Sequence, residues 1–101
     1  MTKEHECKIL SEAIKEYGEY AQLQMLNEEC AELIKAVCKY MRNPQEENKL
    51  SILEEIADVL VMIEQAQMMY GFDMVKEIRW QKLLRLEARL EVHINNKEKN
   101  Q

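Results

Sequence analysis

Glycine and proline are scarce in this sequence, with Gly 2 and Pro 1 among 101 residues. These residues interrupt helices and form turns, so their scarcity predicts a few long, uninterrupted segments. Hydrophobic residues make up 47% of the chain and charged residues 33%, which suits amphipathic helices with a small shared core. The sequence therefore predicts a single helical domain over residues 1–101.

Long apolar runs, blocks of basic residues and paired cysteines are also missing. No stretch approaches the roughly 18 apolar residues of a membrane span, and the N-terminal residues MTKEHECKIL lack the apolar centre of a signal peptide. The net charge is −5, and Lys and Arg are interspersed with Asp and Glu, which argues against binding to nucleic acid. Cys7, Cys30 and Cys38 form no CxxC pair. We expect a cytoplasmic protein that binds neither nucleic acid nor membrane.

Apolar residues recur at helical spacing in four segments that are joined by short loops. The segments cover about residues 4–17, 19–42, 51–70 and 72–94. The third segment is predicted to begin at Ser51, which acts as the N-cap, with Glu54 completing a capping box. A polar tail that frays from about residue 95 follows the fourth. The pattern predicts an all-α fold, a four-helix bundle.

Two of the predicted helices carry similar acidic sequences beside their apolar stripes. The first is EECAE at residues 28–32, and the second is EEIAD at residues 54–58. With about 100° per residue, the apolar side chains of each helix gather on one side, where we expect the core. The stripe residues are Leu23, Leu26, Cys30, Leu33, Val37, Tyr40 and Met41 in the second helix, and Ile52, Leu53, Ile56, Val59, Leu60 and Ile63 in the third.

Four carboxylates lie on the flanks of these stripes: Glu29 and Glu32 in the second helix, Glu55 and Asp58 in the third. The first glutamate of each acidic sequence points further towards solvent. Asp58 interrupts the apolar run IADVLVMI, and a buried carboxylate without compensation costs several kcal/mol. Hard divalent cations bind carboxylate oxygens, so a metal site would explain the four charges. A solvated acidic helix face is the alternative.

The spacing of these acids is similar to the signature of a known family, the MazG-like all-α nucleoside triphosphate pyrophosphohydrolases. That signature is EExxE followed by ExxD. Glu28, Glu29 and Glu32 match its first part, and Glu55 and Asp58 match its second. The stretches EECAELIKAVCKYMR and EEIADVLVMIEQ also resemble small phage or prophage members beyond the signature.

The resemblance extends over about residues 10–90 and implies a Mg²⁺-dependent enzyme, with Mn²⁺ as a substitute. The carboxylates that it implies as metal ligands and catalytic residues are Glu29, Glu32, Glu55 and Asp58. Glu28 is implied as an auxiliary ligand. Members of the family hydrolyse a nucleoside triphosphate to the monophosphate and pyrophosphate, and a role in nucleotide-pool house-cleaning would fit. Metal ions suit this reaction because they activate water and offset phosphate charge.

A triphosphate substrate also requires positive protein groups. The sequence KLLRLEARL in the fourth helix places Lys82 and Arg85 three residues apart, and family members often carry a lysine and an arginine here. We expect these two side chains to bind phosphate, and ordinary surface cations on an amphipathic helix are the alternative. Trp80 and Tyr70 are candidates for stacking on the base, although a Trp at this spacing is more often part of a core.

Two other functions share part of the pattern. A di-iron bundle typically adds Glu-x-x-His, and neither His5 nor His93 has a Glu three residues before it. A non-catalytic helical oligomerisation or partner-binding protein remains the main alternative, because helices that are apolar over much of their circumference favour burial between subunits. A homodimer or homotetramer is expected under both the enzymatic and the non-catalytic hypothesis.

Overall fold

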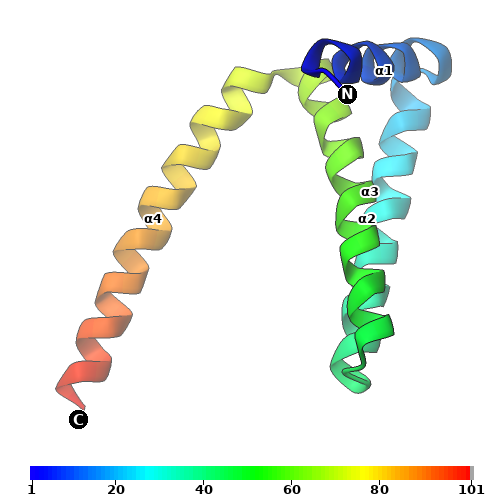
Figure 1. The fold of residues 1–101 in the computed structure, drawn as a ribbon. Coiled ribbons are helices and arrows are strands. Elements are labelled where there is room, and N and C mark those ends of the chain that lie inside the picture. The colour runs from blue at the N-terminus through cyan, green and yellow to red at the C-terminus, as the bar shows by residue number, and fades with distance from the viewer. Residues whose placement is uncertain (101) are drawn as a thin grey trace. The chain divides into compact units, whose positions relative to one another are not determined.

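The computed structural model describes residues 1–100 and contains four α-helices and no strand in that range (Figure 1). The helices are α1 (Lys3–Tyr17), α2 (Glu19–Arg42), α3 (Glu46–Tyr70) and α4 (Phe72–Lys99). This confirms the all-α class, while the packing of all four helices into one bundle or domain stays a prediction. The chain divides into a first unit, Met1–Tyr70, and a second unit that contains α4.

The junction between α1 and α2 consists of one residue, Gly18. Its N–H donates to the carbonyl oxygen of Ile14 over 2.9 Å, and its own carbonyl accepts from the N–H of Gln22 over 3.1 Å. One residue therefore ends α1 and begins α2. Its backbone has φ 89° and ψ 161°, a conformation that is essentially restricted to glycine. The turn places α1 across the end of the α2 and α3 pair (Figure 1).

A side chain at position 18 should therefore destabilise the protein. We expect Gly18→Ala to lower the free energy of unfolding by about 1–3 kcal/mol through backbone strain. A Cβ there would meet no atom within 4 Å, so steric contact adds nothing. Urea unfolding measures the effect, and Ser11→Ala at an exposed position of α1 is the control. Equal stabilities for Gly18→Ala and the wild type would contradict this account of the turn.

The α2–α3 connection is stabilised by a buried asparagine. Asn48 is 4% exposed, and its Nδ2 donates to the backbone carbonyl of Asn43 over 2.8 Å. The carbonyl of Gln45 accepts the backbone N–H groups of Asn48 and Lys49. These contacts reverse the chain within a short loop, so that α2 and α3 pair antiparallel along their length (Figure 1).

The predicted start of the third helix at Ser51 is wrong, because α3 already begins at Glu46. Ser51 lies inside the helix, and its Oγ donates to the carbonyl of Glu47 over 3.2 Å. It therefore caps no free N–H group. The bonds made by Asn48 and Gln45 begin the helix about one and a half turns before the capping box.

The interface between α2 and α3 is centred on residues other than the predicted stripes. Its buried residues are Gln22 and Ala36 of α2, and Asn48, Val59, Met62 and Gln65 of α3. Of the stripe residues only Val59 is among them, and Leu53 and Met41 are 55% and 76% exposed. Positions 22, 29 and 36 of α2, and 48, 55 and 62 of α3, are each seven residues apart, or nearly two turns. The interface thus runs through the acidic positions instead of beside them.

Polar contacts fix the alignment of α2 and α3 near α1. Gln22 Nε2 donates to Gln65 Oε1 over 2.6 Å in a buried environment, and Gln65 Nε2 donates to the sulfur of Met62 over 3.6 Å. Further out, Tyr70 Oη donates to Glu19 Oε1 over 2.6 Å, and this bond raises the pKa of Tyr70. Buried polar groups need such partners, so a shift of α3 along α2 would lose them.

In the second unit, α4 is a helix of 28 residues without a buried side chain. Its apolar side chains are exposed, among them Trp80 at 57% and Leu86 at 56%. The helix continues through the polar residues from 95 to 99, where the sequence predicts fraying. Within residues 1–100, none of the helices is long and apolar enough for a membrane crossing.

Candidate metal centre

Three of the predicted carboxylates meet between α2 and α3. Glu29 comes from α2, and Glu55 and Asp58 come from successive turns of α3. One carboxylate oxygen from each lies within 4.8 Å of the other two. Glu29 and Glu55 are half-buried, whereas Asp58 is exposed. The antiparallel pairing therefore brings the two acidic sequences together, with their oxygens close enough to share one ion.

The cluster is electrostatically unfavourable without a cation. Burial raises the pKa of Glu29 above its ordinary value, and the charges of Asp58 and Glu55 raise it further. A side-chain hydrogen bond with Asp58 acts in the same direction. Both burial and nearby like charges disfavour an ionised carboxyl group. A divalent ion bound to these oxygens would reverse that balance, because it favours the ionised form of every ligand.

Within residues 1–100, one carboxylate oxygen of Glu55 lacks a hydrogen-bond partner. Its Oε2 atom is buried and has no hydrogen-bond partner in the part of the chain that the structure describes. Buried polar atoms without partners are rare in native proteins, and each needs an explanation. Glu55 belongs to the group of three carboxylates described above. The residues fit a hard cation such as Mg²⁺, which takes carboxylate oxygens as ligands.

The other two glutamates of EECAE lie outside this group. Glu32 is exposed, yet its charge contributes to the raised pKa of Glu29, so it lies near the cluster. Glu28 is also exposed and lines a pocket with Tyr17 and Gln22. The structure thus groups three of the four main predicted ligands. Metal binding by Glu32, and by Glu28 as an auxiliary ligand, stays a prediction.

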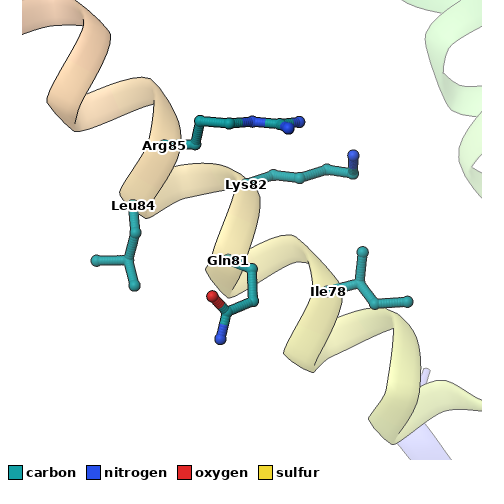
Figure 2. Close-up of a pocket in the computed structure, with 5 residues that line it drawn as sticks. All are labelled: Ile78, Gln81, Lys82, Leu84 and Arg85. Atoms are coloured by element: carbon teal, nitrogen blue, oxygen red, sulfur yellow. The ribbon is translucent and has the colours of Figure 1, made fainter.

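The predicted phosphate-binding residues lie on α4 in the second unit. Lys82 and Arg85 line a groove with Ile78, Gln81 and Leu84, and all five residues belong to that helix. In Figure 2 the Lys82 and Arg85 side chains extend to the same side of the helix. Their spacing of three residues therefore places both cations on one side of the helix. Their role in phosphate binding stays a prediction.

The buried glutamines were not predicted, although the sequence contains a signal for them. Gln22 lies seven residues before Glu29, and Gln65 lies seven residues after Asp58. A step of seven residues is nearly two helical turns, so each glutamine shares a side of its helix with an acidic residue. Their pairing follows from the same antiparallel alignment that groups the acids.

The fold and the acidic cluster define a class: an all-helical protein with a cluster of three carboxylates between two antiparallel helices. No protein-family model matches the chain, and no curated protein or solved structure matches it significantly. A function is therefore inferred from the residues of the cluster and from the chemistry of their oxygens.

Proposed function

We propose that this protein is a Mg²⁺-dependent nucleoside triphosphate pyrophosphohydrolase of the MazG-like type. It would convert a ribo- or deoxyribonucleoside triphosphate and water to the monophosphate and pyrophosphate. The observation that carries the proposal is the convergence of the carboxylates of Glu29, Glu55 and Asp58, together with a buried, unpartnered oxygen on Glu55. The same three residues match the acidic signature of that family.

The roles of the chain's own groups follow from their placement. Glu29, Glu55 and Asp58 would hold the cation, which when bound offsets charge on the phosphates and makes a water molecule more acidic. Glu32 lies one turn from Glu29 and outside the three-residue group. Its carboxylate is therefore available to accept a proton from the attacking water as the anhydride between the α and β phosphates breaks.

The remaining substrate charge is assigned to Lys82 and Arg85. Both cations project from the same side of α4 (Figure 2), and charge-assisted hydrogen bonds to phosphate are strong. They would bind phosphate groups of the substrate. Loss of either charge is expected to change the affinity for substrate and the rate of pyrophosphate release, because neither residue belongs to the cluster of carboxylates.

A nucleotide panel tests the reaction. Standard and chemically modified nucleoside triphosphates are incubated with Mg²⁺ or Mn²⁺, and pyrophosphate is measured separately from orthophosphate. We expect monophosphate and pyrophosphate in equal amounts from at least one nucleotide, and none after chelation of the metal. Release of orthophosphate alone would indicate a different phosphohydrolase. No product from any nucleotide would reject the enzymatic proposal in favour of the alternative below.

The alternative is a non-catalytic helical protein that oligomerises or binds a partner. Exposed apolar residues favour it: Leu53 and Leu60 of α3 are 55% and 51% exposed, and α4 buries no residue. Among residues 1–100, three buried hydrophobic residues form a small core, and small domains often compensate by association. We therefore propose a homodimer or homotetramer under either function. We also propose that the protein is cytoplasmic. Sedimentation measures the association, and the nucleotide panel separates the two functions.

A further inference from the structure

A pocket of about 470 Å³ lies in the first unit, on the α1 side of the acidic cluster. Residues of all three helices of the unit line it, including Tyr17 of α1, Gln22, Gln24, Met25 and Glu28 of α2, and Met62 of α3. Its volume falls within the range of about 300–1,000 Å³ that is typical of small-molecule sites. The cluster and the phosphate-binding assignment leave this pocket without a role.

The pocket is one helical turn away from the carboxylates. Met25 precedes Glu29 by four residues, and Met62 follows Asp58 by four residues. Because α2 and α3 are antiparallel, both steps lead towards α1, and each covers about 6 Å along its helix axis. A group bound in the pocket would thus be separated from the cluster by a distance that a ribose can bridge.

The lining combines an aromatic ring and apolar thioether side chains with hydrogen-bond acceptors. Tyr17, Met25 and Met62 supply an aromatic ring and two polarisable thioethers, which suit the faces of a heterocycle. Glu28 supplies a carboxylate, which accepts hydrogen bonds when ionised. Gln22 is 6% exposed and donates its amide N–H to Gln65. Within residues 1–100 its carbonyl oxygen accepts no hydrogen bond, so it offers a second acceptor to a ligand.

We infer that this pocket is a nucleobase subsite whose acceptors select a base with adjacent N–H donors, guanine above all. This inference depends on the function proposed for the carboxylate cluster. Guanine presents N1–H and an exocyclic amino group side by side, which a carboxylate can accept together. Uracil and thymine present a single N–H between two carbonyl oxygens, and those oxygens would face the carboxylate of Glu28. The pocket therefore favours guanine over uracil.

The first experiment compares kcat/KM for GTP and UTP in the wild type and in Glu28→Gln. We expect the wild type to prefer GTP, and the variant to lose about 10- to 100-fold of that preference, the effect of losing hydrogen bonds to a charged acceptor. The Mg²⁺ concentration for half-maximal activity should stay the same. Glu54→Gln is the control, because Glu54 is exposed and lies outside both the pocket and the cluster.

Glu28 is also a predicted auxiliary metal ligand, and the same data separate the two roles. If Glu28→Gln lowers GTP and UTP hydrolysis equally and raises the Mg²⁺ requirement, Glu28 serves the metal and the subsite inference is overturned. Unchanged selectivity with unchanged metal dependence overturns it as well. Because Glu28 is exposed, loss of folding is not an expected complication of this substitution.

A binding experiment separates failure of the subsite from failure of the proposed reaction. Guanosine and uridine, which carry no phosphate, are titrated without metal while the side-chain amide signals of Gln22 are followed by NMR. We expect guanosine, and not uridine, to shift these signals. Shifts with no hydrolysis in the nucleotide panel would support the subsite and reject the reaction. Hydrolysis without a guanine preference and without shifts would reject the subsite alone.

Discussion

Mg²⁺ or Mn²⁺ should raise the free energy of unfolding of the wild type by about 2.7 kcal/mol at a hundredfold excess over its dissociation constant. The Asp58→Asn variant should lose this response. The physical reason is that, in the proposed site, the cation would bind only where the carboxylates of Glu29, Glu55 and Asp58 are grouped, and unfolding separates them. Thermal or urea unfolding across a series of metal concentrations measures the effect.

Without metal, Asp58→Asn should raise the free energy of unfolding above that of the wild type. Asp58 is the charge that most raises the pKa of Glu29, so its neutralisation relieves repulsion and should stabilise the metal-free protein. The control is Glu54→Gln, which removes an exposed carboxylate outside the cluster. It should respond to metal as the wild type does. A normal metal response in Asp58→Asn would exclude this residue from the site.

The pH dependence of stability provides a further check on this result. The pKa of Glu29 is raised on folding above its ordinary value of 4.5, so the folded state binds this proton more tightly than the unfolded state. In the metal-free protein, the contribution of Glu29 to stability should therefore increase as the pH falls through its folded pKa towards 4.5. With Mg²⁺ present the trend should reverse, because protonation removes ligands.

The helix boundaries could be predicted wherever local sequence determines them. Gly18 ends one helix and begins the next, and the observed α2 (Glu19–Arg42) agrees with the expected segment. The start of α3 could not be predicted in the same way. It depends on the buried side chain of Asn48 reaching back to Asn43, a contact that exists only once the loop has formed. The capping box at Ser51 was a valid local pattern that this contact overrode.

The core could be predicted only in part, for a related reason. A helical projection finds the direction in which apolar side chains gather, but the partner helix decides which side is covered. Here α3 packs on the side of α2 that carries Gln22, Glu29 and Ala36. The predicted stripe of α3 is therefore largely exposed in this chain, as Leu53 shows.

The candidate site was more predictable than the core. The repeated acidic spacing predicted a site of four carboxylates, Glu29, Glu32, Glu55 and Asp58. The antiparallel pairing groups all of them except Glu32. The unpartnered oxygen of Glu55 could not be foreseen, because a sequence does not show which of two carboxylate oxygens becomes buried. The pocket beside Glu28 also needed the position of α1, which Gly18 sets through its unusual backbone conformation.

Replacement of Glu55 by Gln should lower kcat for nucleotide hydrolysis by on the order of 10³-fold, the upper range for loss of one preorganised electrostatic group. The amide keeps the shape of the side chain and removes its charge. The metal-free variant should nevertheless be more stable than the wild type, because Glu55 is one of the charges that raise the pKa of Glu29. Pyrophosphate release and urea unfolding of the same preparation measure the two effects.

A comparison with Glu32→Ala separates metal binding from proton transfer. Both variants should lose pyrophosphate release, but high Mg²⁺ should partly restore Glu55→Gln, whose defect lies in metal affinity. Higher pH should partly restore Glu32→Ala, because hydroxide replaces the missing proton acceptor. Wild-type activity in Glu55→Gln would reject the cluster as the catalytic site. Identical behaviour of the two variants towards Mg²⁺ and pH would instead place Glu32 among the metal ligands, as a fourth carboxylate beside Glu29.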